Sequence, residues 1–267
     1  PNKKWSPDAY HYIATHHKDL WIIESDSTYF GWFVGGNQTG DFAGNTFAEK
    51  HAAGHGALGD FFANGIQFDG RKRTNLKMGD TPSVAWLLRG DPSMPFQPGW
   101  GGRYVRAWTR PYALFNRLTT AADQVEFCGI LELVLPLGEN APPNPEARMV
   151  IENQSLIGHP DGEGNIRFRF CPKEAKLYRY TIRGNVPALD GRTGEITSTP
   201  IPLTATLAPD PAYPNWWTDD PSPELMEGTH YGARTVSCWR EEYLRDFIER
   251  LDRCAQPASA ARNAMSK

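Results

Sequence analysis

The chain has 267 residues, of which 40% are hydrophobic and 22% charged, and its formal net charge is −3 at neutral pH. This composition is typical of a soluble globular protein that is large enough to bury a sizeable core. The small negative charge gives no broad positive field, which excludes nucleic acid as an expected partner. No apolar run approaches the roughly 20 residues of a membrane-spanning helix, so no membrane partner is expected either.

The first predicted elements are a helix over residues 6–14 and a short buried strand over residues 20–23. The helix has a serine cap and a proline at its first position, and its apolar residues follow helical spacing. The polar loop after the strand holds Glu24, Asp26 and Tyr29. Because open α/β sheets form ligand crevices at the carboxyl ends of their strands, these three side chains are candidate ligands for sugar hydroxyls. The alternative is an ordinary solvated loop.

Two glycine-rich loops contain further candidates. His55 lies between Gly54 and Gly56. Because histidine is the usual acid or base side chain at neutral pH, it is a candidate catalytic general acid. The alternative is a histidine that hydrogen-bonds a tight turn. In the second loop, Trp100 could offer a ring platform to a sugar and Arg103 a fork of donors to its hydroxyls. The alternative there is a loop anchored on the sheet.

Asp80 is the most informative single residue, because it lies where a loop turns into a helix. Pro82 fits the first helical turn, and Asp80 or Thr81 can cap that turn with a side-chain oxygen. The apolar run over residues 84–88 predicts a buried helix, whose amino-terminal end favours an ionised carboxylate. Asp80 is therefore either an ordinary cap or a ligand to a metal ion or substrate.

From about Val125 the pattern changes to short strands. Residues 125–135 form an apolar strand that ends at a proline, and a proline-rich link covers residues 142–145. Alternating segments between Asp-Gly turns then predict a small antiparallel β module. Apolar residues at helical spacing between residues 236 and 251 predict a long amphipathic helix. The four cysteines show no C-x-x-C spacing, and a pairing of Cys128 with Cys171 stays open.

These patterns predict the fold class and the domain boundaries. We expect an open α/β part over residues 1–135 and an antiparallel, sandwich-like β module over residues 136–212. A closing segment and helix over residues 213–254 should dock on the α/β part. Residues 255–267 should form a flexible tail.

Several different short sequence blocks follow one another in a fixed order along the chain. They are Trp21-Ile22-Ile23-Glu24 with Tyr29 and Gly31-Trp32-Phe33; Gly54-His55-Gly56-Ala57-Leu58-Gly59; Met78-Gly79-Asp80-Thr81-Pro82-Ser83; Trp100-Gly101-Gly102-Arg103; Tyr180-Thr181-Ile182-Arg183 with Leu189-Asp190-Gly191; and Trp216-Trp217-Thr218-Asp219-Asp220-Pro221 with Arg234-Thr235-Val236-Ser237. Together they resemble the carboxyl-terminal half of a bacterial nucleoside-hydrolase-like family, some members of which are described as cellulose-binding.

The resemblance implies a hydrolase of a ribosyl or other glycosyl bond that is assisted by calcium. In nucleoside hydrolases an amino-terminal aspartate cluster holds the ion together with one aspartate that opens a buried helix, and Asp80 stands in that position. Calcium lowers the pKa of a bound water and holds sugar hydroxyls, while a carboxylate takes the proton of the water. The water then attacks an oxocarbenium-like carbon.

Two departures from the family pattern change these expectations. Gly79 stands where nucleoside hydrolases carry the histidine that assists departure of the base, so the substrate need not be a nucleoside. The aspartate cluster is expected from an amino-terminal segment of the same gene product, and the isolated chain should show no turnover. The alternative is a non-catalytic protein that binds cellulose-type glycans. Expected partners are a sugar, a nucleoside-like molecule or a glycan, with a homo-oligomer possible in principle, and a periplasmic or secreted location is favoured over the cytoplasm.

Overall fold

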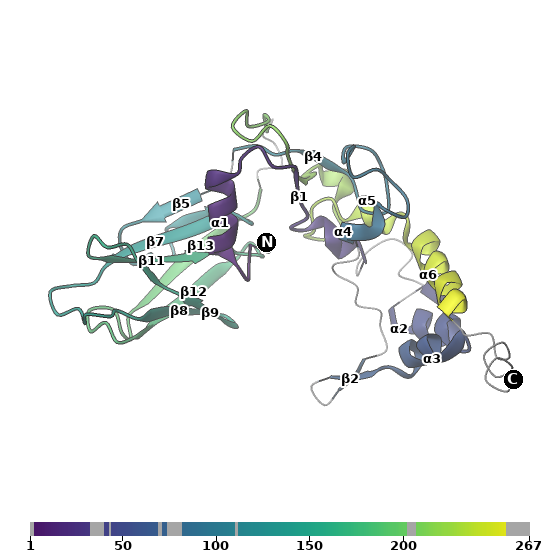
Figure 1. The fold of residues 1–267 in the computed structure, drawn as a ribbon, viewed down its shortest axis with the longest axis horizontal. Coiled ribbons are helices and arrows are strands. Elements are labelled where there is room, and N and C mark those ends of the chain that lie inside the picture. Colours follow the sequence, from purple (N-terminus) through teal and green to yellow (C-terminus); the bar gives the residue numbers. More distant parts are fainter. Residues whose placement is uncertain are drawn as a thin grey trace, which may run out of the picture. The chain divides into compact units, whose positions relative to one another are not determined.

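The computed structural model describes residues 3–32, 40–42, 44–68, 71–73, 82–109, 112–201 and 207–254 (Figure 1). The chain forms two compact units, each made of two separate stretches. Unit 1 contains residues 1–22 and 106–216, and unit 2 contains residues 23–105 and 217–267.

Unit 1 is built mainly of strands. Its elements are α1 (Pro7–His16), β5 (Tyr112–Phe115), β6 (Gln124–Glu126), β7 (Ile130–Pro136), β8 (Ala147–Ile151), β9 (Gln154–Ile157), β10 (His159–Pro160), β11 (Asn165–Phe170), β12 (Leu177–Gly184) and β13 (Thr193–Thr199). The strands form two sheets, with the orders β10-β11-β7-β5 and β6-β13-β12-β8-β9. Most pairs are antiparallel, but β5 pairs with β7 and β6 with β13 in parallel.

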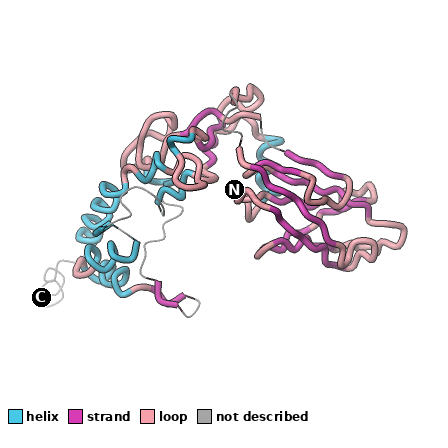
Figure 2. The backbone as a smooth tube through the Cα atoms, turned by 180° about the vertical axis from the view of Figure 1, so that it is seen from behind, coloured by secondary structure: helices cyan, strands magenta, loops and turns pink. Residues whose placement is uncertain are grey.

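The two sheets share one hydrophobic core. Inward side chains come from alternate positions of the strands, as the alternation of apolar and polar residues requires. Leu133 of β7 and Phe168 of β11 meet Met149 of β8 and Ile182 of β12 in this core. Figure 2 shows the magenta strands of this unit gathered together. The predicted β module is therefore present as two sheets around a common core.

The compact units divide the chain at different residues from the predicted boundaries. We expected residues 1–135 to form one part, yet α1 and β5 to β7 belong to unit 1. The reason is strand pairing, because β7 is hydrogen-bonded to β11 on one side and to β5 on the other. A continuous apolar strand shows that it is buried, but it does not show which sheet it joins.

Unit 2 combines a small sheet with short helices. Its elements are β1 (Ile22–Glu24), 3-10 turns at Thr28–Trp32, Gly40–Phe42 and Pro223–Leu225, α2 (Gly44–Phe47), a π-helical turn at Ala48–Ala52, α3 (Gly56–Asn64), β2 (Ile66–Phe68), β3 (Arg71–Arg73), α4 (Pro82–Ala85), β4 (Tyr104–Arg106), β14 (Trp216–Asp219), α5 (Arg234–Ser237) and α6 (Arg240–Cys254). The sheet has the order β1-β14-β4, and β2 pairs with β3 separately. The predicted amphipathic helix is present as α6, whose Tyr243 and Leu244 pack with Trp32 and Trp100.

The predicted buried helix over residues 84–88 is wrong. α4 spans only four residues, and Leu87 is 75% exposed, with Val84 and Leu88 also exposed. Trp86 alone turns its large side chain inward, where Gly101 packs against it so closely that a Cβ there would lie 2.3 Å from the indole. Because the loop through Gly101 covers Trp86, the chain turns after Ala85 and leaves both leucines outside.

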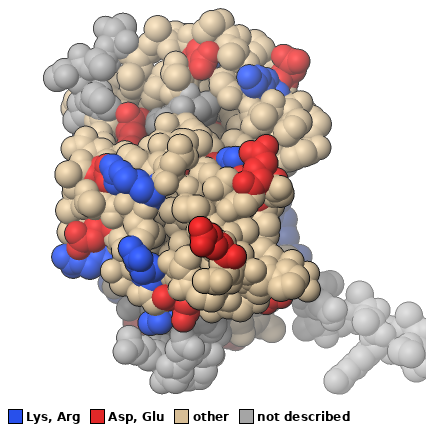
Figure 3. Space-filling model, turned by 90° about the vertical axis from the view of Figure 1, so that its left-hand side faces the viewer, with Lys and Arg blue, Asp and Glu red and all other residues tan. Residues whose placement is uncertain are grey.

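Three further observations bear on the expected environment. Cys128 and Cys171 are free buried thiols, so the disulfide that the sequence left open is not formed. No helix in the described ranges has the length and apolar character that a transmembrane span requires. On the face that Figure 3 presents, acidic and basic side chains are interspersed, as expected from the small net charge.

Candidate functional site

The centre of the candidate site is the turn that follows β1. Asp219, the last residue of β14, is 2% exposed and faces this turn. Its Oδ2 accepts hydrogen bonds from the backbone N–H groups of Asp26 (3.1 Å) and Ser27 (2.8 Å). Its Oδ1 accepts one from the N–H of Thr28 (3.0 Å). One carboxylate therefore holds three successive amides and fixes the turn.

Two further carboxyl groups are buried at the same turn. Glu24 is 7% exposed and Asp26 is 9% exposed, so the predicted polar loop is not solvated. Buried carboxylates are uncommon unless they have partners, and both residues do have interaction partners. The structure thus brings together two of the predicted sugar ligands. Tyr29, the third, is half-buried with its ring centroid 4.4 Å from that of Phe30.

Tyr104 of β4 also contacts this turn through its hydroxyl group. Its hydroxyl donates to Ser25 Oγ (2.9 Å) and lies 3.1 Å from the carbonyl oxygen of Gly101. Burial, and then the negative charge of Asp219, raise the pKa of Tyr104. The phenol is therefore a neutral hydrogen-bond donor and not a base.

Arg103 precedes Tyr104 and is anchored at one end of its guanidinium. Its Nη2 lies 2.8 Å from Asp220 Oδ2, and its backbone N–H donates to Thr235 Oγ1 (3.0 Å). The Asp220 side chain is almost completely buried, whereas that of Arg103 is 38% exposed. The anchored guanidinium keeps N–H groups for a ligand, because it carries five donors and this ion pair uses one of them.

The structure places the remaining candidates elsewhere. Trp100 is 7% exposed and its ring contacts Tyr243 edge-on, with centroids 6.3 Å apart, so it lies in the core as the anchoring alternative proposed. His55 stands at the start of α3, with its Nδ1 2.6 Å from Asp252 Oδ1 of α6. Figure 1 shows α3 beside the far end of α6, away from β1 and β4. His55 is therefore not part of the turn after β1.

Asp80 lies outside the described residues. Within the described ranges, no group of three or more His, Cys, Asp or Glu side chains is placed to hold a metal ion. Calcium usually takes six to eight oxygen ligands. Calcium, with Asp80 as its ligand, therefore stays a prediction.

The sequence reasoning missed the residues that organise the site. Asp219 and Asp220 appear in the block Trp216-Trp217-Thr218-Asp219-Asp220-Pro221, but no local pattern connects that block with residues 24–28. The available signal was a run of carboxylates directly after an apolar strand. Asp219 and Asp220 mark the carboxyl end of β14 in this way, as Glu24 and Asp26 mark that of β1.

The described fold is mixed α/β, with three open sheets of three or more strands and few helices. Residues 3–104 match the model of a family described as the nucleoside hydrolase-like domain of the cellulose-binding protein Sde182. The predicted resemblance is confirmed for these residues, which include β1, the turn after it and Arg103. No curated protein sequence matches the chain.

Two solved structures are similar to parts of the chain. A candidate glycoside hydrolase from Bacteroides vulgatus is 29% identical over 30% of this chain and 17% of its own, with a TM-score of 0.26. A nucleoside hydrolase-related hypothetical protein from Saccharophagus degradans, associated with carbohydrate metabolism, is 14% identical over 73% of this chain and 60% of its own, with a TM-score of 0.25. Both TM-scores are too low to indicate a common fold for the whole chain.

Proposed function

We propose that the chain supplies the sugar-recognising part of a glycosyl-bond hydrolase of nucleoside-hydrolase type. The observation that carries this proposal is the burial of Glu24 and Asp26 at the end of β1, inside the segment that matches the family model. A carboxylate accepts hydrogen bonds from sugar hydroxyls, and a guanidinium donates to their oxygens. Glu24 and Asp26 with the anchored Arg103 are thus complementary to a pair of neighbouring sugar hydroxyls.

In this proposal the hydrolytic water is activated outside the described part of the chain. Calcium, when bound, would lower the pKa of that water and polarise the sugar hydroxyls. Asp80 is the proposed ligand from this chain, together with aspartates from an amino-terminal segment of the same gene product. The described residues orient the sugar and exclude water from the turn, and Tyr104 holds the turn as a neutral donor.

The second candidate is a non-catalytic protein that binds cellulose-type glycans. It is favoured by the position of His55, which is paired with Asp252 and lies away from the turn after β1. No general acid is then placed beside Glu24 and Asp26 by the described residues. Either function would be exercised in the periplasm or outside the cell, where glycans are encountered.

Glycan binding tests the site that both candidates share. The variants Asp26→Asn and Glu24→Gln keep the side-chain shape but remove the charge, so each should weaken binding about tenfold through the loss of charge-assisted hydrogen bonds. The measurement is depletion of the protein from solution by cellulose and by xylan, with assay of released reducing sugar. Glu249→Gln makes the same change on the exposed face of α6 and should bind as the unchanged protein does.

Each result of that experiment has one meaning. Binding that falls in both site variants, with sugar released by the full-length gene product, supports the hydrolase. The same fall with no released sugar supports the non-catalytic protein. Equal binding by all variants would remove the turn after β1 as a sugar site.

Calcium binding is the direct test of Asp80. Titration calorimetry on the full-length gene product should show a calcium site whose affinity falls at least about tenfold in Asp80→Asn, because one ionised ligand is lost. Asp91→Asn, in an exposed loop where Asp91 accepts from Ser93, is the matched control. Equal affinity in the Asp80→Asn variant and the unchanged protein would exclude Asp80 as a ligand.

A further inference from the structure

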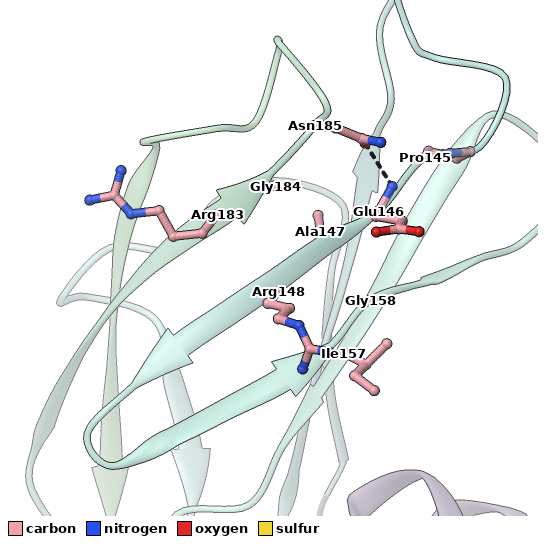
Figure 4. A pocket seen from close by; sticks show the side chains of 9 residues that line it. All are labelled: Pro145, Glu146, Ala147, Arg148, Ile157, Gly158, Arg183, Gly184 and Asn185. Atoms are coloured by element: carbon pink, nitrogen blue, oxygen red, sulfur yellow. Dashed lines mark hydrogen bonds between the residues drawn. The ribbon is translucent and has the colours of Figure 1, made fainter.

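A groove of about 590 Å³ lies on unit 1, at the junction of β8, β9 and β12 (Figure 4). Its lining includes Arg148, Arg183, Ile157, Glu146 and Asn185. These residues belong to unit 1, whereas the turn after β1 belongs to unit 2. The groove therefore needs an explanation of its own.

The most unusual feature of the groove is a pair of arginines on neighbouring strands. Arg183 of β12 is the direct register partner of Arg148 of β8. Like charges at directly opposite positions destabilise a sheet. Neither guanidinium has an ion pair or hydrogen bond within the described part of the chain.

Other strand arginines of the same unit are neutralised. Arg179, four residues before Arg183 on β12, pairs with Glu195 of β13 at 2.7 Å. On the other sheet, Arg167 and Arg169 both pair with the buried carboxylate of Glu132 at 2.8 Å. Unit 1 therefore supplies carboxylates to these arginines but leaves the facing pair in the groove without one.

The walls of the groove are fixed by backbone contacts. A Cβ on Gly184 would lie 2.1 Å from the carbonyl oxygen of Glu146, so the two strands can approach only because this residue is glycine. The Oδ1 of Asn185 accepts from the N–H of Glu146 (2.8 Å), and its Nδ2 donates to the carbonyl of Asn144 (3.0 Å). Asn185 thus holds the wall together, and the arginines are the main donors that remain for a ligand.

An apolar surface adjoins the two guanidiniums. Ile157 is the register partner of Arg148 on β9 and is 52% exposed, and Val150 of β8 is also exposed. Figure 4 shows Arg148 extending beside Ile157 and Arg183 directed away from it, so the two guanidiniums point apart across the sheet. The lining carries two positive charges and the single negative charge of Glu146.

The geometry points to a binding site for an acidic oligosaccharide, in which Arg148 holds the carboxylate of one sugar unit and Arg183 that of another. A carboxylate can accept paired hydrogen bonds from a guanidinium, and one carboxylate on each arginine would neutralise the two charges that repel each other across the strands. The C–H groups of the sugar ring would pack on Ile157 and Val150. An inorganic anion would use the arginines but not this apolar surface.

Calorimetry on the full chain tests the site with trigalacturonate as the probe. Arg148→Gln and Arg183→Gln should each weaken binding about tenfold, as the loss of a charge-assisted hydrogen bond predicts. Arg179→Gln removes the same charge from the same strand outside the groove and should leave affinity unchanged within about twofold. Neutral cellotriose should fail to compete with trigalacturonate, and sulfate at equal ionic strength should compete only weakly.

Thermal melting separates loss of the site from loss of the fold. Because the facing arginines repel each other, Arg183→Gln should melt at the same temperature as the unchanged chain or higher. Binding that is equal in the Arg148→Gln and Arg183→Gln variants and the unchanged chain would overturn the proposal. Competition by sulfate as strong as that by trigalacturonate would also overturn it, because the apolar surface would then contribute nothing. Asp26→Asn should leave trigalacturonate binding intact, which keeps this test independent of the turn after β1.

Discussion

Replacement of Asp219 by asparagine is expected to lower the free energy of unfolding of unit 2 by about 3 kcal/mol. The carboxylate accepts from three backbone amides and is almost completely buried. Asparagine keeps one acceptor oxygen, but it places an NH₂ group against amides that are also donors. At least one buried amide is then left without a partner, and the charge that strengthened the other bonds is lost.

Urea denaturation followed by tryptophan fluorescence measures this effect, because unit 2 contains Trp32, Trp86, Trp100, Trp217 and Trp239. The matched control is Asp91→Asn, since Asp91 accepts from the N–H of Ser93 in an exposed loop of the same unit. That control should change stability by less than about 1 kcal/mol. A loss in Asp219→Asn no larger than in the control would show that the turn after β1 does not depend on Asp219.

Replacement of Glu132 by glutamine is expected to destabilise unit 1 by about 3 to 5 kcal/mol. Glu132 is almost completely buried on β7 and accepts from Arg167 and Arg169 at 2.8 Å, and it is also bonded by the hydroxyl of Tyr112. The side chain of Arg169 is itself largely buried. Glutamine removes the buried charge that both arginines share, and leaves Arg169 with Asp8 (2.8 Å) and Arg167 with Asp161 (3.4 Å) as their remaining carboxylate partners.

The control for Glu132 is Glu195→Gln, which breaks the exposed pair with Arg179 on the other sheet. An exposed ion pair contributes about 0 to 1 kcal/mol, so this variant should unfold almost as the unchanged chain does. Circular dichroism in the far ultraviolet follows the strands of unit 1. A similar small loss in both variants would contradict the structural role assigned to Glu132.

Local sequence patterns predict the helices and strands whose buried residues recur at a regular helical or alternating spacing. The helix α1 has a proline at its start, and α6 has apolar residues at helical spacing, so both were found from the sequence. The strands β8, β11 and β12 are predictable because their residues alternate between inward and outward positions. The length of α4 was not predictable in this way, because it depends on how Trp86 packs against a loop that follows it.

The candidate site was predicted only in part. Glu24 and Asp26 were found because carboxylates directly follow an apolar strand, which is a local signal. Their burial was not predicted, since it depends on Asp219 and Tyr104, which are distant in sequence. His55 and Trp100 were named from loop composition alone, and the structure places them beside α6 and in the core. Asp80 lies outside the described residues and stays a prediction.

The bonds between Asp219 and the turn after β1 join residues that are 191 to 193 positions apart. The segment that matches the family model ends at residue 104, so it contains the turn but neither the acid that holds it nor β14, the strand beside β1. A fragment truncated at residue 104 would therefore expose the amides of residues 26–28 and one edge of β1 to solvent. Any shortened version of this protein must therefore retain residues 216–219 if the turn after β1 is to keep these bonds and β1 its neighbouring strand.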